Sequence, residues 1–414
     1  MTDLTLSVRF DELDMDEVLE VLASHFGFGR MEPGEVRFWR GAAGVDVEVS
    51  RRGRIARIRL WPGVTSDEVD AIRNEVEDAL VVNQTPTAAQ YVGFCSRPVT
   101  NCYRYRGKFQ ILPVPNGAPL PNVKIADHPF LLQYWYNWSS HLSVSARRRL
   151  EQAQKYLRLL DLLSGTRIHG GPRYIQHAWV WPPMEEPDDR ASRWAQLGYN
   201  YPGLTHEIQG LSDMAGCQPV RFVPAAYHFA HLGVTGESLA LPDDVERALD
   251  LAFGLGAHDR KRLERALIYL GHAKSVWYES QSLSYVGHVM AIEALVDKPE
   301  RCEVCRQAIL QQGTRCRACS QAMFGTTRAF KEFLETHAPA IHDEPGVRNR
   351  LYALRSALAH GYEVMLRDLS PLTSIGWYSR QESELEATLQ RISGAAIRSW
   401  LHSRQVEQPT VQPT

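Results

Sequence analysis

Short runs of alternating hydrophobic and polar residues fill the first 85 positions. EVRFWR, VDVEVS and IARIRLW predict three strands separated by glycine-bearing turns, and LTLSVRF predicts another strand before them. MDEVLEVLASHF has the spacing of an amphipathic helix. SDEVDAIRNEVEDALV predicts a second helix, with Ser66 as its N-cap and acidic residues in its first turn. We expect a small α/β domain over residues 1–85.

Residues 86–242 combine strand-like pieces with one long helix. YVGFC, CYRYR and KFQILPV predict strands before a proline-rich loop, and RYIQHAWVW predicts an aromatic strand further on. A helix is expected over about 143–164, capped by Ser143 or Ser145, with one apolar face formed by the leucines at 150, 157, 160 and 163. We interpret this region as a mixed α/β domain, a candidate sensor or substrate-positioning module.

The pattern changes to helical spacing from residue 243 onward. Six segments between DDVERALDLAFGL and ELEATLQRISGAAIRSWLHS predict helices, which indicates a bundle over residues 243–402. The tail VEQPTVQPT predicts disorder over residues 403–414. The expected fold class is α+β, with an N-terminal mixed α/β region followed by an all-α bundle.

The composition limits the classes of function. A chain of 414 residues exceeds one ordinary hydrophobic core, so several domains are expected. The net charge of −2 excludes a generally basic surface, and a nucleic-acid site would have to be a local basic patch. The N-terminus lacks the pattern of a signal peptide, and the sequence has no apolar run long enough to span a bilayer. We expect a cytoplasmic protein without a membrane partner.

Four of the seven cysteines form two CxxC pairs within residues 301–320, and ten residues separate the pairs. Each pair can present two thiolates to one tetrahedral ion, and four thiolates leave no position open for water. This pattern favours a small structural zinc ribbon or knuckle, and a redox CxxC pair is the weaker alternative. The other cysteines are expected to be buried thiols. The predicted zinc ligands are Cys302, Cys305, Cys316 and Cys319.

GVRNRLYALRSALAHG predicts a helix with one apolar stripe, formed by Val347, Leu351, Leu354 and Leu358. Arg355 and His360 lie about 140° apart on an ideal helix and bracket a polar strip that points away from this stripe.

That strip contains Tyr352 and Ser356, and Ser356 is close enough to His360 to orient its imidazole. Gly361 is the natural C-terminal stop, which places His360 in the last turn, where the helix dipole favours a protonated imidazole. An arginine beside such a histidine can bind phosphate and move a proton, although helices without a catalytic role also end in His-Gly.

Two sequence features together resemble the Apea-like branch of the HEPN superfamily. Arg355-Ser-Ala-Leu-Ala-His360-Gly361, preceded by Leu351-Tyr352, resembles its signature helix. RALIYLGHAKSVW followed by VGHVMAIEALV is similar to its preceding helix pair, with Glu293 in the place of the family's acidic residue. The resemblance covers about residues 243–402, and the cysteine segment would be an insertion between core helices.

The resemblance implies a metal-independent endoribonuclease in which two protomers line one cleft and the ribose 2′-hydroxyl attacks the adjacent phosphate. His360 would be the general acid/base and Arg355 would stabilise the transition state. Ser356 would orient His360 or contact the phosphate. Because a carboxylate in an apolar helix is costly alone, Glu293 is expected to pair with Arg355 or another cation, in a structural or a catalytic role. Candidate substrate-binding residues on the same helix are Arg348, Asn349 and Tyr352.

The implied partners are RNA, with tRNA among the candidate substrates, and further copies of the chain in a homodimer or larger homo-oligomer. Architectures of this kind resemble bacterial anti-phage, abortive-infection and toxin-like systems, in which a phage-derived trigger would activate cutting. Zinc would be structural, and catalysis would need no cofactor. A second reading is a non-catalytic module that dimerises and binds RNA or nucleotide. In a third, the zinc segment reads nucleic acid and the helices only carry it.

Overall fold

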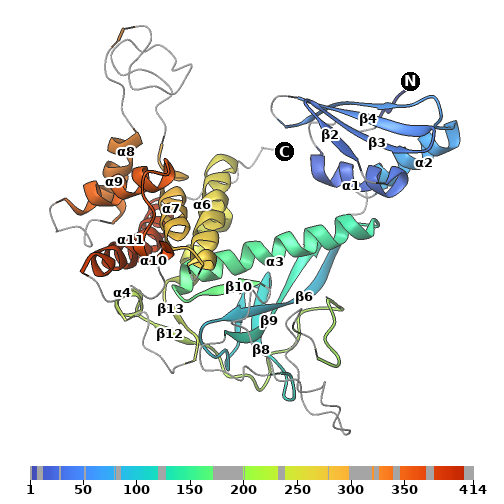
Figure 1. Cartoon of the computed structure of the whole chain (residues 1–414). Coiled ribbons are helices and arrows are strands. Elements are labelled where there is room, and N and C mark those ends of the chain that lie inside the picture. The colour runs from blue at the N-terminus through green and yellow to red at the C-terminus, as the bar shows by residue number, and fades with distance from the viewer. Residues whose placement is uncertain are drawn as a thin grey trace, which may run out of the picture.

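The computed structural model is a mixed α+β protein with sheets in its N-terminal part and helices in its C-terminal part (Figure 1). One long helix, α3 (Leu142–Ser164), runs along the molecule between the N-terminal unit, the second sheet and the helices. The structure describes residues 2–6, 13–27, 29–50, 53–78, 80, 85–119, 127–170, 199, 201–231, 238–277, 279–297, 319–320, 326–338, 346–369 and 377–404.

The N-terminal unit is an antiparallel sheet in the order β1-β5-β4-β3-β2, with a separate hydrophobic core. Helix α1 packs against β3, β4 and α2, as its apolar face predicts. The elements are β1 (Thr2–Asp3), α1 (Met15–Phe26), β2 (Arg30–Glu32), β3 (Glu35–Arg40), β4 (Ala43–Val49), β5 (Ile55–Leu60) and α2 (Ser66–Glu77).

Two local predictions in this unit need correction. The strand expected over LTLSVRF does not include its described residues, 4–6; strand β1 instead lies just before them, at Thr2–Asp3, and positions 7–10 lie outside the described residues. The N-cap of α2 is Thr65 rather than Ser66, because Thr65 and Glu68 form a reciprocal capping box.

The second sheet has the order β10-β6-β9-β8-β7, and β11 also pairs with β6. Its two longest strands, β6 and β9, pair from Pro86 opposite Asn137 to Cys95 opposite His128. Two short parallel strands and a helical turn follow. The elements are β6 (Pro86–Cys95), β7 (Tyr103–Tyr105), β8 (Phe109–Pro113), β9 (His128–Asn137), β10 (Ile168–Gly170), β11 (Glu207–Ile208), β12 (Arg221–Val223), α4 (Ala225–Ala230) and β13 (Ala240–Pro242).

Helix α3 matches its expected span, but two details differ. Its N-cap is His141, and no side-chain hydrogen bond caps the helix, so the expected cap at Ser143 or Ser145 is wrong. Leu150 is exposed, whereas the leucines at 157, 160 and 163 are buried against the sheet and the helices. The strand expected over RYIQHAWVW lies outside the described residues.

The C-terminal part is a group of packed helices whose core is continuous with that of the second sheet. Helices α6 and α7 form the most extensive helix pair, α11 crosses α5, α6, α7 and α8, and α9 packs on α7 and α8. The helices are α5 (Val245–Gly254), α6 (Ala257–Val276), α7 (Gln281–Glu293), α8 (Thr326–His337), α9 (Val347–Ala359), α10 (Leu366–Leu369) and α11 (Trp377–His402).

Ion pairs fasten the N-terminal unit to α3. The guanidinium of Arg148 donates two hydrogen bonds of 2.6 Å to the carboxylate of Glu17 on α1. Arg147 pairs with Asp16 at 2.7 Å, and Val144 inserts into the N-terminal core. The first turns of α3 therefore belong to the packing of both units.

Candidate functional site on helices α7 and α9

Helix α9 ends in a glycine cap that presents His360 to solvent. Gly361 adopts a left-handed conformation with φ of +71°, which glycine tolerates best. Its N–H donates to the carbonyl of Leu358, and the N–H of Tyr362 donates to the carbonyl of Ala357 at 2.9 Å. This is the hydrogen-bond pattern of a Schellman motif, so the expected stop at Gly361 is confirmed. His360 is the exposed residue just before the reversal.

The apolar stripe of α9 faces the core as its spacing predicts. Val347 and Leu351 are buried, and Leu354 and Leu358 are half-buried against the same hydrophobic cluster. The Tyr285 hydroxyl donates a 2.9 Å hydrogen bond to the carbonyl of Leu351. This contact fixes the position of α9 on α7.

The first turn of α7 is held by an acid far away in the sequence. Asp368 accepts hydrogen bonds from the Ser280 hydroxyl at 2.7 Å and from the backbone N–H groups of Gln281 and Ser282 at 2.7 and 3.0 Å. Partial burial raises the pKa of Asp368, but the hydrogen bonds outweigh it and lower that pKa below its ordinary value. The carboxylate therefore acts as a negatively charged cap at the N-terminus of α7.

Glu293, the last residue of α7, pairs with Arg355 of α9. The Glu293 Oε2 atom lies 3.0 Å from Nη2 of Arg355, and each side chain is about a quarter exposed, at 25% and 23%. The expected pairing of Glu293 with Arg355 is thus confirmed. The Nε atom of Arg355 is buried without a hydrogen-bond partner among the described residues. Glu293 fixes the guanidinium from one side and leaves donor capacity for a ligand.

Tyr352 does not lie on an open strip away from the core, as its place on the helical wheel had suggested. It is half-buried, its ring lies 5.5 Å from the ring of Phe330 on α8, and the Arg355 guanidinium stacks over it at 5.6 Å. The prediction missed this because α8 packs on that side of α9. Tyr352 supports the guanidinium of Arg355 through a cation–π contact.

The other two candidate substrate-binding residues lie near the start of α9. Arg348 forms an ion pair with Glu335 of α8, and Asn349 is exposed. The pair commits the Arg348 side chain to an inter-helix contact, so Asn349 is the more accessible of the two.

Ser356 and His360 are connected through the backbone. The carbonyl of Ser356 accepts a 3.1 Å hydrogen bond from the N–H of His360. The expected bond between the Ser356 hydroxyl and the imidazole is not among the hydrogen bonds of the described residues. The imidazole lies near the ring of Tyr362, with 5.9 Å between the centroids. Its exposure leaves it accessible to a ligand or a second protein chain.

An open hollow of about 530 Å³ lies beside Glu293, between α6 and the end of α7. Buried Arg262 forms part of its wall and holds the end of α7 by bonding the carbonyl of Leu295 and pairing with Asp297 at 2.7 Å. The wall also contains His258, Arg265 and Tyr269. The sequence analysis did not single out these three, because charges on a helix normally indicate a solvated face. Their i, i+7 and i+11 spacing places them on one face of α6 and was the available signal.

The predicted zinc ligands Cys302, Cys305 and Cys316 lie outside the described residues, and Cys319 is half-buried at the edge of that segment. Elsewhere in the described part of the chain, histidine, cysteine and acidic side chains do not gather in groups of three suited to a metal ion. A search of the described helices finds none with the length and apolar character needed to cross a membrane.

Comparison with known proteins gives no relative: no protein-family model, no curated protein and no solved structure matches the chain.

Proposed function

We propose that the chain is a HEPN-type endoribonuclease that cuts RNA without a catalytic metal. The observation that carries this proposal is the Glu293–Arg355 ion pair between α7 and α9, followed five residues later by an exposed histidine at the helix end. An arginine that is held by one carboxylate and is still about a quarter exposed can offer further N–H donors to a phosphate whose charge increases in the transition state.

In this proposal the 2′-hydroxyl of the ribose attacks the adjacent phosphorus and the bond to the 5′-oxygen breaks. The proton of the 2′-hydroxyl passes to a neutral imidazole, and a protonated imidazole supplies the proton for the leaving 5′-oxygen. His360 is the general acid/base, and Arg355 stabilises the added negative charge. Glu293 is a positioning residue, and Ser356 contacts the phosphate or orients His360. The products are a 2′,3′-cyclic phosphate and a 5′-hydroxyl.

A second copy of the chain supplies the second imidazole. Large apolar side chains are exposed on the segment that follows His360 and at the start of α7: Tyr362 is 83% exposed, Leu369 67%, Val364 48% and Leu283 63%. Backbone and side-chain bonds from Met365 and Asp368 to the start of α7 hold this segment beside Leu283. An apolar surface of this kind marks a protein contact, and we assign it to homodimerisation.

The remaining parts of the proposal concern context. The four cysteines of segment 301–320 hold a structural zinc ion, and the part before residue 243 senses a trigger or positions the substrate. tRNA is the substrate to test first. A cytoplasmic role in bacterial defence, with a phage-derived trigger, fits an RNA-cutting activity and rests on the family resemblance.

The test is a cleavage assay on mixed tRNA and on single-stranded RNA, with and without EDTA. The intact protein is compared with Arg355→Ala and His360→Ala. Matched controls are Arg57→Ala and His206→Ala, which remove an exposed arginine from β5 and an exposed histidine just before β11. We expect EDTA-resistant cleavage that leaves 2′,3′-cyclic phosphate ends, is lost in both site variants and is retained in both controls.

Cleavage that survives in both site variants would place the active site elsewhere. The alternative function is a non-catalytic module in which the helices dimerise and bind RNA or nucleotide. A dimer that binds RNA and does not cut it, even with lysate from phage-infected cells added, would favour that alternative. Cysteine-to-serine variants that fold and lose RNA binding would assign recognition to the zinc segment.

A further inference from the structure

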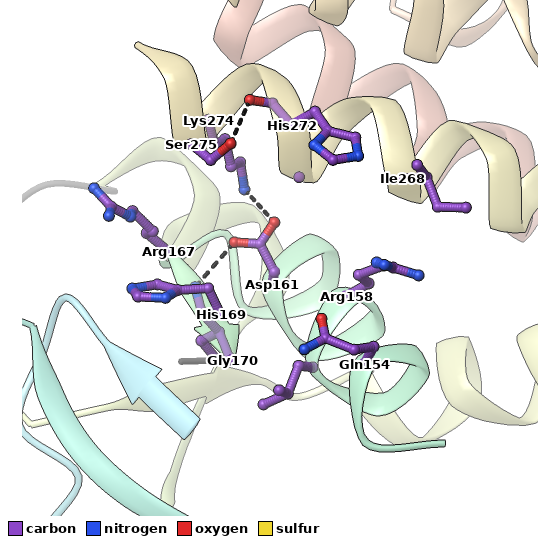
Figure 2. A pocket seen from close by; sticks show the side chains of 13 residues that line it. Gln154, Arg158, Asp161, Arg167, His169, Gly170, Ile268, His272, Lys274 and Ser275 are labelled. Atoms are coloured by element: carbon purple, nitrogen blue, oxygen red, sulfur yellow. Dashed lines mark hydrogen bonds and ion pairs between the residues drawn. The ribbon is translucent and has the colours of Figure 1, made fainter. Parts of the chain in front are cut away.

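A second, smaller cavity lies where α3, β10 and α6 meet, away from the Glu293–Arg355 pair (Figure 2). Its volume is about 60 Å³. On this measure a water molecule needs about 10–15 Å³, so the cavity accepts on the order of four water-sized atoms. It therefore suits a small, compact group better than a nucleotide base or a peptide segment.

Most of the charged side chains around this cavity are cationic. Asp161, which is buried, is the acid among the described lining residues, and both of its oxygens are occupied. One accepts the N–H of Ile168 at 3.0 Å, and the other accepts from Lys274 at 2.7 Å (Figure 2). A lysine ammonium carries three N–H donors, so Lys274 keeps donor capacity beyond this pair.

Further donors come from both helices. Arg158 and Gln154 on α3 face His272 on α6 across the opening (Figure 2). Behind β10, the Asp127 carboxylate accepts a hydrogen bond from His169 at 2.7 Å and pairs with Arg167 at 3.3 Å. Asp127 therefore offsets the positive charge of Arg167 on that side of the cavity. The concentration of donors therefore lies between Arg158, His272 and Lys274.

An independent indication comes from Gly271, which lies in the middle of α6 and lines the cavity. A Cβ atom added there would meet nothing within 4 Å, so the packing of the chain does not require a glycine. Gly287 on α7 is different, because its Cβ would lie 2.9 Å from that of Ala273 where the two helices touch. A glycine inside a helix costs about 0.5–1 kcal/mol relative to alanine. The glycine at position 271, in spite of this cost, leaves the space of the cavity free of a side chain.

We propose that this cavity binds a phosphoryl group, with Arg158, His272 and Lys274 as the charged donors. A phosphoryl group has a compact set of oxygen atoms that fits the volume, and these oxygens can accept hydrogen bonds from an arginine, a lysine and a histidine. The site joins α3 to α6, and α6 packs on α7, so binding would strengthen the contact between the sheet and the helices. The inference does not depend on RNA cleavage.

The test is isothermal titration calorimetry of the full chain at constant ionic strength. The ligands are inorganic phosphate, AMP with adenosine as its control, and a short RNA with either a 5′-phosphate or a 5′-hydroxyl. Arg158→Gln removes a donor. Gly271→Leu places a side chain in the space, while leucine favours helix and its Cβ meets no atom within 4 Å there. Lys261→Gln is the matched control, because it removes an exposed charge from α6 outside the cavity.

We expect phosphate to bind, AMP to bind better than adenosine, and Arg158→Gln and Gly271→Leu each to weaken binding by about tenfold or more. Lys261→Gln should bind as the wild type does. A preference for 5′-phosphorylated RNA over AMP would identify an RNA end as the source of the phosphoryl group, and the reverse preference would identify a small molecule. The inference fails if phosphate, AMP and 5′-phosphorylated RNA all fail to bind. It also fails if Gly271→Leu binds normally, or if Lys261→Gln weakens binding as much as Arg158→Gln.

Discussion

Protonation of His288 should make the helical part of the protein sensitive to acid. This residue of α7 is completely buried, and its Nδ1 lies 2.8 Å from the hydroxyl of Ser393 on α11. The Ser393 hydroxyl donates its proton to the carbonyl of Gln390, so Nδ1 of the imidazole carries the hydrogen and donates to Ser393. Nε2 is then the bare nitrogen, and it is buried without a partner among the described residues. A proton added there would be a buried charge without an acceptor.

Burial, assisted by the charge of Lys274, lowers the pKa of His288 from 6.5 to about 3. The unfolded chain takes up this proton near pH 6.5, whereas the folded chain does not until about pH 3, so the unfolded state binds more protons between these values. The free energy of unfolding therefore falls as the pH decreases through this window. At about 1.4 kcal/mol per pH unit, lowering the pH from 8 to 5 should cost about 2 kcal/mol from this residue alone.

The assay is urea unfolding at pH 8, 7, 6 and 5, followed by circular dichroism and tryptophan fluorescence. His288→Asn keeps a donor near the Ser393 hydroxyl and cannot titrate, so it should be less stable at pH 8 and lose about 2 kcal/mol less than wild type down to pH 5. Burial also lowers the pKa of His128, His228 and His402, so only the difference between the two slopes reports His288. His206→Asn, at an exposed position, should follow the wild type. Parallel slopes for wild type and His288→Asn would refute the argument.

Three further predictions concern single sites. If the proposed nuclease activity is correct, Glu293→Gln and Arg355→Gln should each reduce cleavage by about 100-fold, with the double variant no worse than Arg355→Gln. A double-mutant cycle with these variants, measured by urea unfolding, should give a coupling free energy below about 1 kcal/mol, because the pair is partly exposed. A large coupling free energy with normal cleavage would make the ion pair purely structural. Gly361→Ala should lower the free energy of unfolding, measured with urea, by about 1 kcal/mol, because alanine is strained at φ of +71°. Gly361→Asn should lower it less, because asparagine tolerates this backbone conformation better. Burial raises the pKa of the Cys95 thiol to about 12, so mass spectrometry should find it unmodified by iodoacetamide at pH 8 and alkylated after unfolding; rapid native labelling would contradict the burial.

Local periodicity predicted the N-terminal helices and most strands, because the helices and strands such as β3 have one mostly buried and one mostly solvated face. Helix α1 matches its predicted span from end to end. Strand β9 was not predicted. Its sequence HPFLLQYWYN does not alternate, because the strand lies inside the sheet between β6 and β8 and is buried along most of its length.

The same sheet contains a polar feature that no local pattern could indicate. Gln110, Gln133 and Gln90 lie side by side on β8, β9 and β6, are buried, and donate amide hydrogen bonds of 2.7 and 2.8 Å from one to the next. Glutamine in a strand normally indicates the solvated face. Only the register of the three strands shows that these amides satisfy one another.

For the candidate site, the confirmed prediction came from an energetic argument. A carboxylate in the apolar helix of Glu293 needed a cation, and Arg355 supplies it. The cavity at α6 could not be predicted, because its walls are brought together by contacts such as Asp161 with Lys274, 113 residues apart. Asp368, which holds the start of α7 from 87 residues away, is a similar case.

Helix α3 also has a mechanical consequence. Its 23 residues form a rod about 34 Å long that is clamped by Glu17 at Arg148 and tied to α6 at Asp161 (Figure 1). If the rod pivots near its first turns, a tilt of about 5° displaces the opposite end by about 3 Å, which is the length of a hydrogen bond. Because the second half of α3 is buried against the second sheet, that sheet would have to turn with it, and a small rotation at the N-terminal unit would become a larger displacement near α6. The hydrogen bond between Lys274 and Asp161, near that end of α3, would be the first contact to lengthen.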